Sequence, residues 1–107
     1  MNSNETADLI CKTLEDKKAY DIIKIDVKDK TIIADYFVIA SGKTSRAVKA
    51  LADYAIEAVE KAGGEVRRKE GMEDARWAVV DFGDVILHVF NDETRLFYHL
   101  ERLWSQT

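Results

Sequence analysis

Gly42-Lys43-Thr44 is the part of this sequence whose residue types could hold a nucleotide. It matches the end of the phosphate-binding loop G-x-x-x-x-G-K-[ST], in which backbone N–H groups surround the phosphates. The first glycine of that loop would stand where this sequence has Phe37, inside an apolar run. Because a phenylalanine in a strand cannot form the turn around the phosphates, we interpret the stretch as a strand end followed by a helix cap at Thr44 or Ser45.

Two basic residues are left unexplained by that interpretation. Lys43 and Arg46 lie in or beside the first turn of the predicted helix, where positive charge opposes the helix dipole. They are either solvated surface charges or contacts for an anion, such as an acidic side chain or an RNA phosphate. Arg67 and Arg68 are a second pair that could touch RNA.

The histidines and the cysteine form no pattern typical of catalysis or of a metal site. No serine, cysteine or aspartate stands beside His88 or His99 in the arrangement of a catalytic triad. Zinc sites need closely spaced cysteine or histidine ligands, and Cys11 is the single cysteine. We therefore interpret neither histidine as catalytic, place Cys11 on the core side of a helix, and expect no metal and no cofactor.

The composition limits the classes of function open to the protein. Its 107 residues fit one compact domain, and a formal charge of −4 favours a basic partner over general nucleic-acid binding. No apolar run approaches the roughly 18 residues that cross a bilayer, and the first residues, MNSNETADLI, do not resemble a signal peptide. We expect a single domain over residues 1–107, located in the cytoplasm and without membrane contact.

Periodic hydrophobic patterns predict the elements that position these residues. In chain order they are a helix over 3–19, strands over 21–27 and 35–42, a helix over 45–62, a charged edge strand over 65–71, a hairpin over 76–90 and a helix over 91–104. Ser3 or Asn4 can cap the first helix, and Gly63-Gly64 ends the second. The order α-β-β-α-β-β-β-α predicts an α/β domain with a mixed sheet of about five strands and three helices.

The hairpin has a predictable register if Gly83-Asp84 is a two-residue turn. One sheet face then carries only apolar side chains and packs on helices. The opposite face places Trp77 across from Phe90, Val79 from His88 and Asp81 from Ile86. We expect part of this mixed face to be exposed, because three helices do not fully cover both faces of a five-stranded sheet. An exposed tryptophan beside an acid is typical of an interaction surface. The alternative is that Trp77 and Phe90 are core residues.

Three stretches together resemble the ribosomal silencing factor family, also called Iojap or RsfS-like. They are IADYFVIASGKTSRAVKALAD, RWAVVDFGDVILHVF and ETRLFYHLERLW, which occur in the family's order and cover about two-thirds of the chain. The resemblance implies a nucleotidyltransferase-like fold without transferase activity. It also implies binding to the large ribosomal subunit at the ribosomal protein numbered fourteen in the universal nomenclature. Occupying that site blocks joining of the small subunit and lowers translation, and free family members are often homodimers.

The residues themselves suggest which surface could bind such a partner. Acidic side chains at Asp81 and Asp84, together with Tyr98 and Glu101 outside the apolar stripe of the last predicted helix, could face a basic ribosomal protein. With Trp77, His88 and Phe90 they form our predicted partner-binding set. The alternative for the acids is a solvated surface.

The alternative function is a nucleotidyltransferase-like enzyme acting on a nucleoside triphosphate. That chemistry needs two metal ions held by clustered carboxylates, commonly two acids at i and i+2 on one strand face. Asp81 and Asp84 stand three apart across a predicted turn, and Asp35 opens a strand. We therefore expect no enzymatic activity.

Overall fold

A five-stranded mixed sheet forms the centre of this computed structural model, which describes residues 1–92. The elements are α1 (Ser3–Asp16), β1 (Tyr20–Asp26), β2 (Tyr36–Gly42), α2 (Ser45–Lys61), β3 (Arg68–Glu70), β4 (Trp77–Asp81) and β5 (Val85–Asn91). The strand order is β1-β2-β5-β4-β3, with β2 and β5 parallel and the other pairs antiparallel. The predicted fold class is confirmed, whereas the last predicted helix lies, after its first two residues, outside the described residues.

The first helix begins earlier than the sequence suggested. Asn2 is its N-cap, so the expected cap at Ser3 or Asn4 is wrong. The Asn2 side chain accepts from the Glu5 backbone N–H at 2.8 Å, and the Glu5 carboxylate accepts from the Asn2 N–H at 3.0 Å. This reciprocal pair requires the acid three residues after the cap, which Asn2 satisfies and Ser3 does not.

The second helix has the predicted ends. Thr44 caps it by accepting from the Ala47 N–H at 3.0 Å. At the other end Gly63 adopts φ 91°, and the Gly64 N–H donates to the Val59 carbonyl at 2.9 Å. These bonds satisfy carbonyl groups that the last helical turn leaves unpaired.

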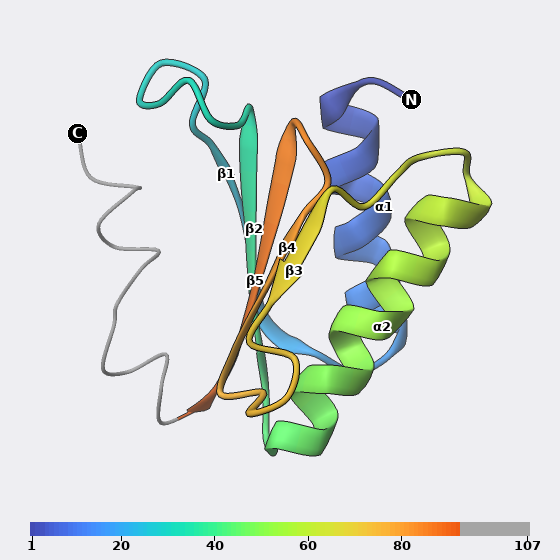
Figure 1. Cartoon of the computed structure of the whole chain (residues 1–107), viewed down its shortest axis with the longest axis vertical. Coiled ribbons are helices and arrows are strands. Elements are labelled where there is room, and N and C mark those ends of the chain that lie inside the picture. Colours follow the sequence, from blue (N-terminus) through green and yellow to red (C-terminus); the bar gives the residue numbers. More distant parts are fainter. Residues whose placement is uncertain (93–107) are drawn as a thin grey trace.

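Both described helices pack on one side of the sheet, which we call the helix face (Figure 1). Ala7, Ile10 and Leu14 of α1 are fully buried there with helix and strand residues that include Val48, Ala52, Val38, Ala40, Val80, Leu87 and Val89. Cys11 packs against this core as expected, but it is only partly buried. The helix face is the larger of the two apolar clusters and anchors the fold.

The hairpin register follows the sequence prediction at every pair. Trp77 opposes Phe90, Val79 opposes His88 and Asp81 opposes Ile86. The Phe82 N–H donates to the Val85 carbonyl at 2.9 Å, which closes a two-residue turn at Gly83-Asp84. Because side chains alternate along a strand, this register fixes which side chains point to the side of the sheet opposite the helices.

Candidate partner-binding surface

The side of the sheet opposite α1 and α2 carries the candidate surface, and we call it the second face. Its cluster holds Ile25, Val27, Ala34, Phe37, Ile39, Ile86 and Phe90, with Ile23, Trp77 and Val79 packed partly against it. No residue of α1 or α2 belongs to this cluster. The second face is therefore apolar at its centre, its exposed polar groups include residues of β3 and β4, and His88 is a buried polar residue on β5.

Exposure on the second face differs between the two hairpin strands. Trp77, Val79 and Asp81 of β4 are partly exposed, as predicted for part of this face. On β5, Ile86 and His88 are buried and Phe90 is fully buried. In the sheet, β5 lies between β2 and β4, whereas β4 borders β3, an edge strand of 3 residues. We call Trp77, Val79 and Asp81 the β4 strip.

Two members of the predicted partner-binding set are not at the surface. Phe90 has 0% exposure, so the core alternative applies to it, and His88 has 7%; neither side chain can form direct contacts in this conformation. Tyr98 and Glu101 lie outside the described residues. The structure thus places Trp77 and Asp81 at the two ends of β4 on the same face, and Asp84 is exposed in the turn after Asp81.

The exposed edge of Trp77 rests on a group of aromatic rings. Trp77 stacks on Phe90 with ring centroids 5.1 Å apart at 22°, and Phe37 lies 5.1 Å from His88. The Trp77 indole N–H donates to Nδ1 of His88 at 3.1 Å. These contacts make the ring of Trp77 a fixed part of the surface and explain why two aromatic partners beneath it are buried.

Burial lowers the pKa of His88 from its ordinary 6.5 to about 4. The physical cause is desolvation, which disfavours the charged imidazolium in an apolar site. His88 is therefore neutral at pH 7, and its Nδ1 can accept the indole N–H only in that form.

We expect this depressed pKa to make the folded state sensitive to acid. Between pH 6.5 and about 4 the unfolded chain binds a proton at His88 that the folded chain does not, so stability is full above pH 6.5 and falls as the pH drops. The expected loss across that window is about 3 kcal/mol. Urea unfolding at several pH values measures it, with His88→Asn as the non-titrating control. Equal pH slopes for the two proteins would contradict this assignment.

The acids near the β4 strip have structural partners as well as exposed oxygen atoms. The Asp81 carboxylate accepts from the Gly83 N–H at 2.7 Å, which holds the turn. Asp81 also lies opposite Arg68 of β3, whose guanidinium pairs with Glu70 at 2.6 Å. Arg68, Glu70, Val79, Asp81 and Ile86 line one hollow. This hollow gives the strip a recess bordered by charges of both signs.

The structure gives no support to a phosphate-binding loop at Gly42. Phe37 is 3% exposed within β2, and all residues from 36 to 42 belong to that strand. Lys43 and Arg46 are exposed at the start of α2. Among residues 1–92, no three histidine, cysteine or acidic side chains are grouped so that they could hold a metal ion. The described helices include none long and apolar enough to span a membrane.

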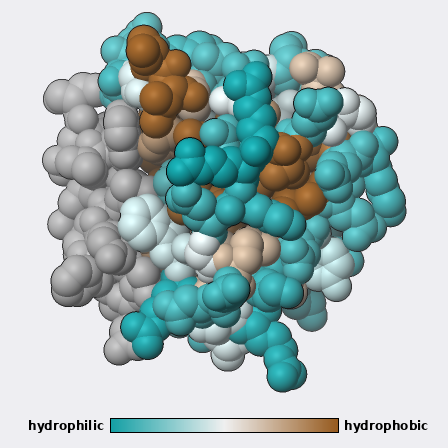
Figure 2. All heavy atoms as spheres, in the orientation of Figure 1, coloured by the Kyte–Doolittle hydropathy of each residue, from teal (hydrophilic) through white to brown (hydrophobic). Residues whose placement is uncertain are grey.

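Two surface features were not predicted. Figure 2 shows an apolar patch over the loop between β1 and β2, where Ile32 is fully exposed and Ile33 is 60% exposed. Two adjacent isoleucines after a turn were the available signal.

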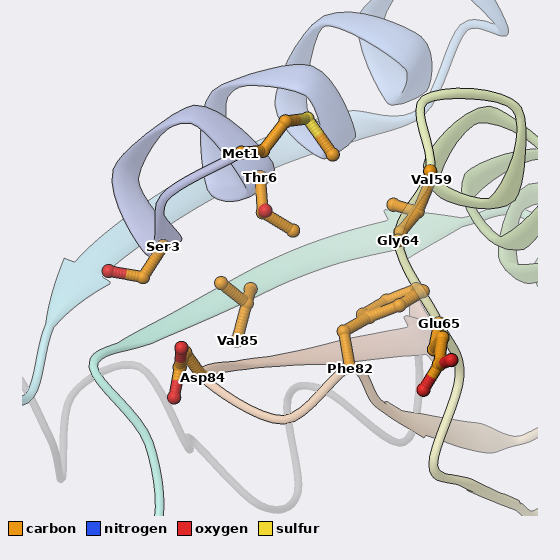
Figure 3. A pocket seen from close by; sticks show the side chains of 10 residues that line it. Met1, Ser3, Thr6, Val59, Gly64, Glu65, Phe82, Asp84 and Val85 are labelled. Atoms are coloured by element: carbon orange, nitrogen blue, oxygen red, sulfur yellow. The ribbon is translucent and has the colours of Figure 1, made fainter.

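Figure 3 shows a pocket between the start of α1, the end of α2 and the hairpin, with Glu65 and Asp84 in its lining. Its residues come from separate segments, so no local motif marks it.

The geometry of the described residues defines an α/β domain with α1 and α2 on one face of its sheet and a candidate protein-binding surface on the other. The sequence matches the family described as "RsfS: Ribosomal silencing factor during starvation" over residues 1–107. The chain belongs to this ribosomal silencing factor family.

Named relatives and a solved structure agree with this assignment. The chain is 38% identical over 105 residues to "Ribosomal silencing factor RsfS" of Halalkalibacterium halodurans, covering 98% of this chain and 90% of that one. It is 35% identical to the mouse "Mitochondrial assembly of ribosomal large subunit protein 1", covering 92% of this chain and 44% of that one. A crystal structure of a protein from Chromobacterium violaceum, 36% identical, has a TM-score of 0.96 and covers 100% of this chain and 89% of that one.

Proposed function

We propose that this protein binds the large ribosomal subunit at the ribosomal protein numbered fourteen in the universal nomenclature. Family membership supports a ribosomal partner, and the mouse relative is named for the ribosomal large subunit. Bound there, the protein excludes the small subunit by occupying space, which represses translation without a chemical step. This role places the protein in the cytoplasm, where the subunits join.

The observation that carries this proposal is the partly exposed β4 strip beside a short edge strand. Trp77 supplies a large aromatic contact, and aromatic side chains dominate the energy of many interfaces. Asp81 and exposed Asp84 supply negative charge, which steers a basic ribosomal protein towards the strip. Arg68 and Glu70 of β3 lie opposite Asp81 and Val79 of the strip, and their side chains are exposed.

Secondary contacts complete the proposal. Lys43 and Arg46 are exposed at the start of α2 and give a minor contact for ribosomal RNA phosphates. When free of the ribosome the protein forms a homodimer, and sedimentation equilibrium of the purified chain tests this part. Raising the salt concentration should weaken ribosome binding, and this salt dependence should be smaller in the double variant Lys43→Ala, Arg46→Ala. Comparing the two proteins tests the RNA contact.

We expect the protein to sediment with isolated large subunits and not with small subunits. Trp77→Ala should weaken this binding by at least about 30-fold, the usual effect of removing an interface hot spot. Tyr54→Ala is the matched control, because Tyr54 is an exposed aromatic residue, 41% exposed, on α2. Gradient centrifugation with quantitative blotting measures both. Equal loss for both variants, or wild-type protein that binds neither subunit, would contradict the proposal.

The blocking step needs its own measurement. Mixing large and small subunits at joining concentrations of magnesium, with and without the protein, reports the joined fraction on a gradient. Wild-type protein added to the large subunit first should lower that fraction, and Trp77→Ala should not. If the protein binds the large subunit without lowering the joined fraction, the proposed partner is supported and the proposed blocking mechanism is contradicted.

A further inference from the structure

His88 and Trp77 form a diagonal pair across the hairpin. Trp77 opposes Phe90 and His88 opposes Val79, so the two rings lie one step apart on the second face. The ring centroids are 5.9 Å apart, and the indole N–H points at Nδ1 of His88 over 3.1 Å. One member of the pair is partly exposed and the other is buried. The buried imidazole therefore contacts the ring that the β4 strip presents.

Packing alone does not explain a histidine at this position. Because Nδ1 accepts the indole N–H, the imidazole proton resides on Nε2. Nε2 is buried and has no hydrogen-bond partner among residues 1–92. A buried polar atom without a partner costs about 1–3 kcal/mol, which a leucine of similar volume would avoid. What a leucine lacks is the Nδ1 acceptor.

The acceptor adds something that ring stacking cannot supply. The stack of Trp77 on Phe90, at 5.1 Å and 22°, fixes the plane of the indole. Stacking does not decide which edge of the indole points inwards, since either edge keeps the same stacked area. The hydrogen bond to His88 selects the edge that bears the N–H. A side chain held in one orientation before binding loses less conformational entropy in the complex.

We propose that His88 is a positioning residue for partner binding, which holds the indole of Trp77 in its docking orientation through the hydrogen bond from Nε1 to Nδ1. This inference rests on the proposed docking role of Trp77. His88 touches no partner itself and acts only through the tryptophan. The ribosomal protein then meets an anchor that is already oriented.

Three variants separate this role from a packing role. His88→Leu removes the acceptor and keeps the volume, whereas His88→Asn keeps an oxygen acceptor near the position of Nδ1. Trp77→Phe keeps a stacked ring and removes the N–H. Binding to purified bacterial large subunits, urea unfolding and the ¹H–¹⁵N signal of the Trp77 indole are measured for each. We expect His88→Leu to shift the indole signal, speed its exchange with water and weaken binding about tenfold, without a loss of stability. His88→Asn should restore both the signal and the binding.

The double variant decides whether His88 acts through the indole. In the Trp77→Phe background, His88→Leu should have no further effect on binding. A further tenfold loss there, or unchanged binding of the single His88→Leu variant despite a shifted indole signal, would overturn the inference. A wild-type protein that does not bind large subunits would instead overturn the proposed function, so the two failures are distinguishable.

Discussion

Gly71→Ala should destabilise the protein by at least about 3 kcal/mol, a large fraction of the stability of a domain this size. Gly71 adopts φ 73°, and a Cβ added to it would lie 2.1 Å from the carbonyl oxygen of Trp77. The obstructing atom is backbone, so no rotamer change relieves the clash. We expect the urea midpoint and the melting temperature to fall together, the latter by about 15 °C.

Gly63→Ala is the matched control for this prediction. Gly63 also has a positive φ, 91°, but a Cβ there would meet no atom within 4 Å. Only the backbone conformation is then penalised, and the expected loss is about 1 kcal/mol. Equal losses for the two variants would show that φ alone, and not the contact with Trp77, explains the glycine at position 71.

The contact at Gly71 also connects the stability of the loop with the proposed surface. Gly71 is the first residue after β3, and Trp77 is the first residue of β4. The Ala75 N–H donates to the Gly71 carbonyl at 2.8 Å, which closes the loop between these strands. A displaced loop would move the start of β4, so Gly71→Ala should weaken subunit binding even where the chain is still folded.

Phe90→Ala is the second variant with a large expected effect, about 3–5 kcal/mol of lost stability. Phe90 has 0% exposure and stacks on Trp77, so truncation leaves a cavity beneath the indole. Chemical unfolding followed by circular dichroism measures the change. The structure assigns Phe90 a packing role, and this result would separate that role from the direct partner contact expected from the sequence.

Phe90→Leu controls for the removal of the aromatic ring. Leucine fills most of the volume, and the expected loss is about 1 kcal/mol. If Phe90→Leu keeps its stability but loses subunit binding as strongly as Trp77→Ala, the support that Phe90 gives to the indole matters for docking. If Phe90→Ala leaves the protein fully stable, the assignment of Phe90 to the core is wrong.

Local patterns in the sequence determined the elements and most of their ends. The hairpin register could be predicted because a two-residue turn at Gly83-Asp84 leaves one pairing, and side-chain alternation then assigns each residue to a face. Thr44 and Gly63-Gly64 mark the ends of α2 through bonds between residues close in sequence. The cap of α1 was missed because Ser3 and Asn4 are also good caps, and only the reciprocal bond to Glu5 selects Asn2.

Only the tertiary structure decided which residues of the second face reach the surface. In sequence, Trp77, His88 and Phe90 are equivalent members of a mixed face. In the structure, His88 and Phe90 of β5 are buried, whereas Trp77 of β4 is partly exposed. The burial of a side chain depends on contacts between residues far apart in the chain, and no local spacing records it. For that reason the sequence could indicate the face but not which of its side chains are accessible to a partner.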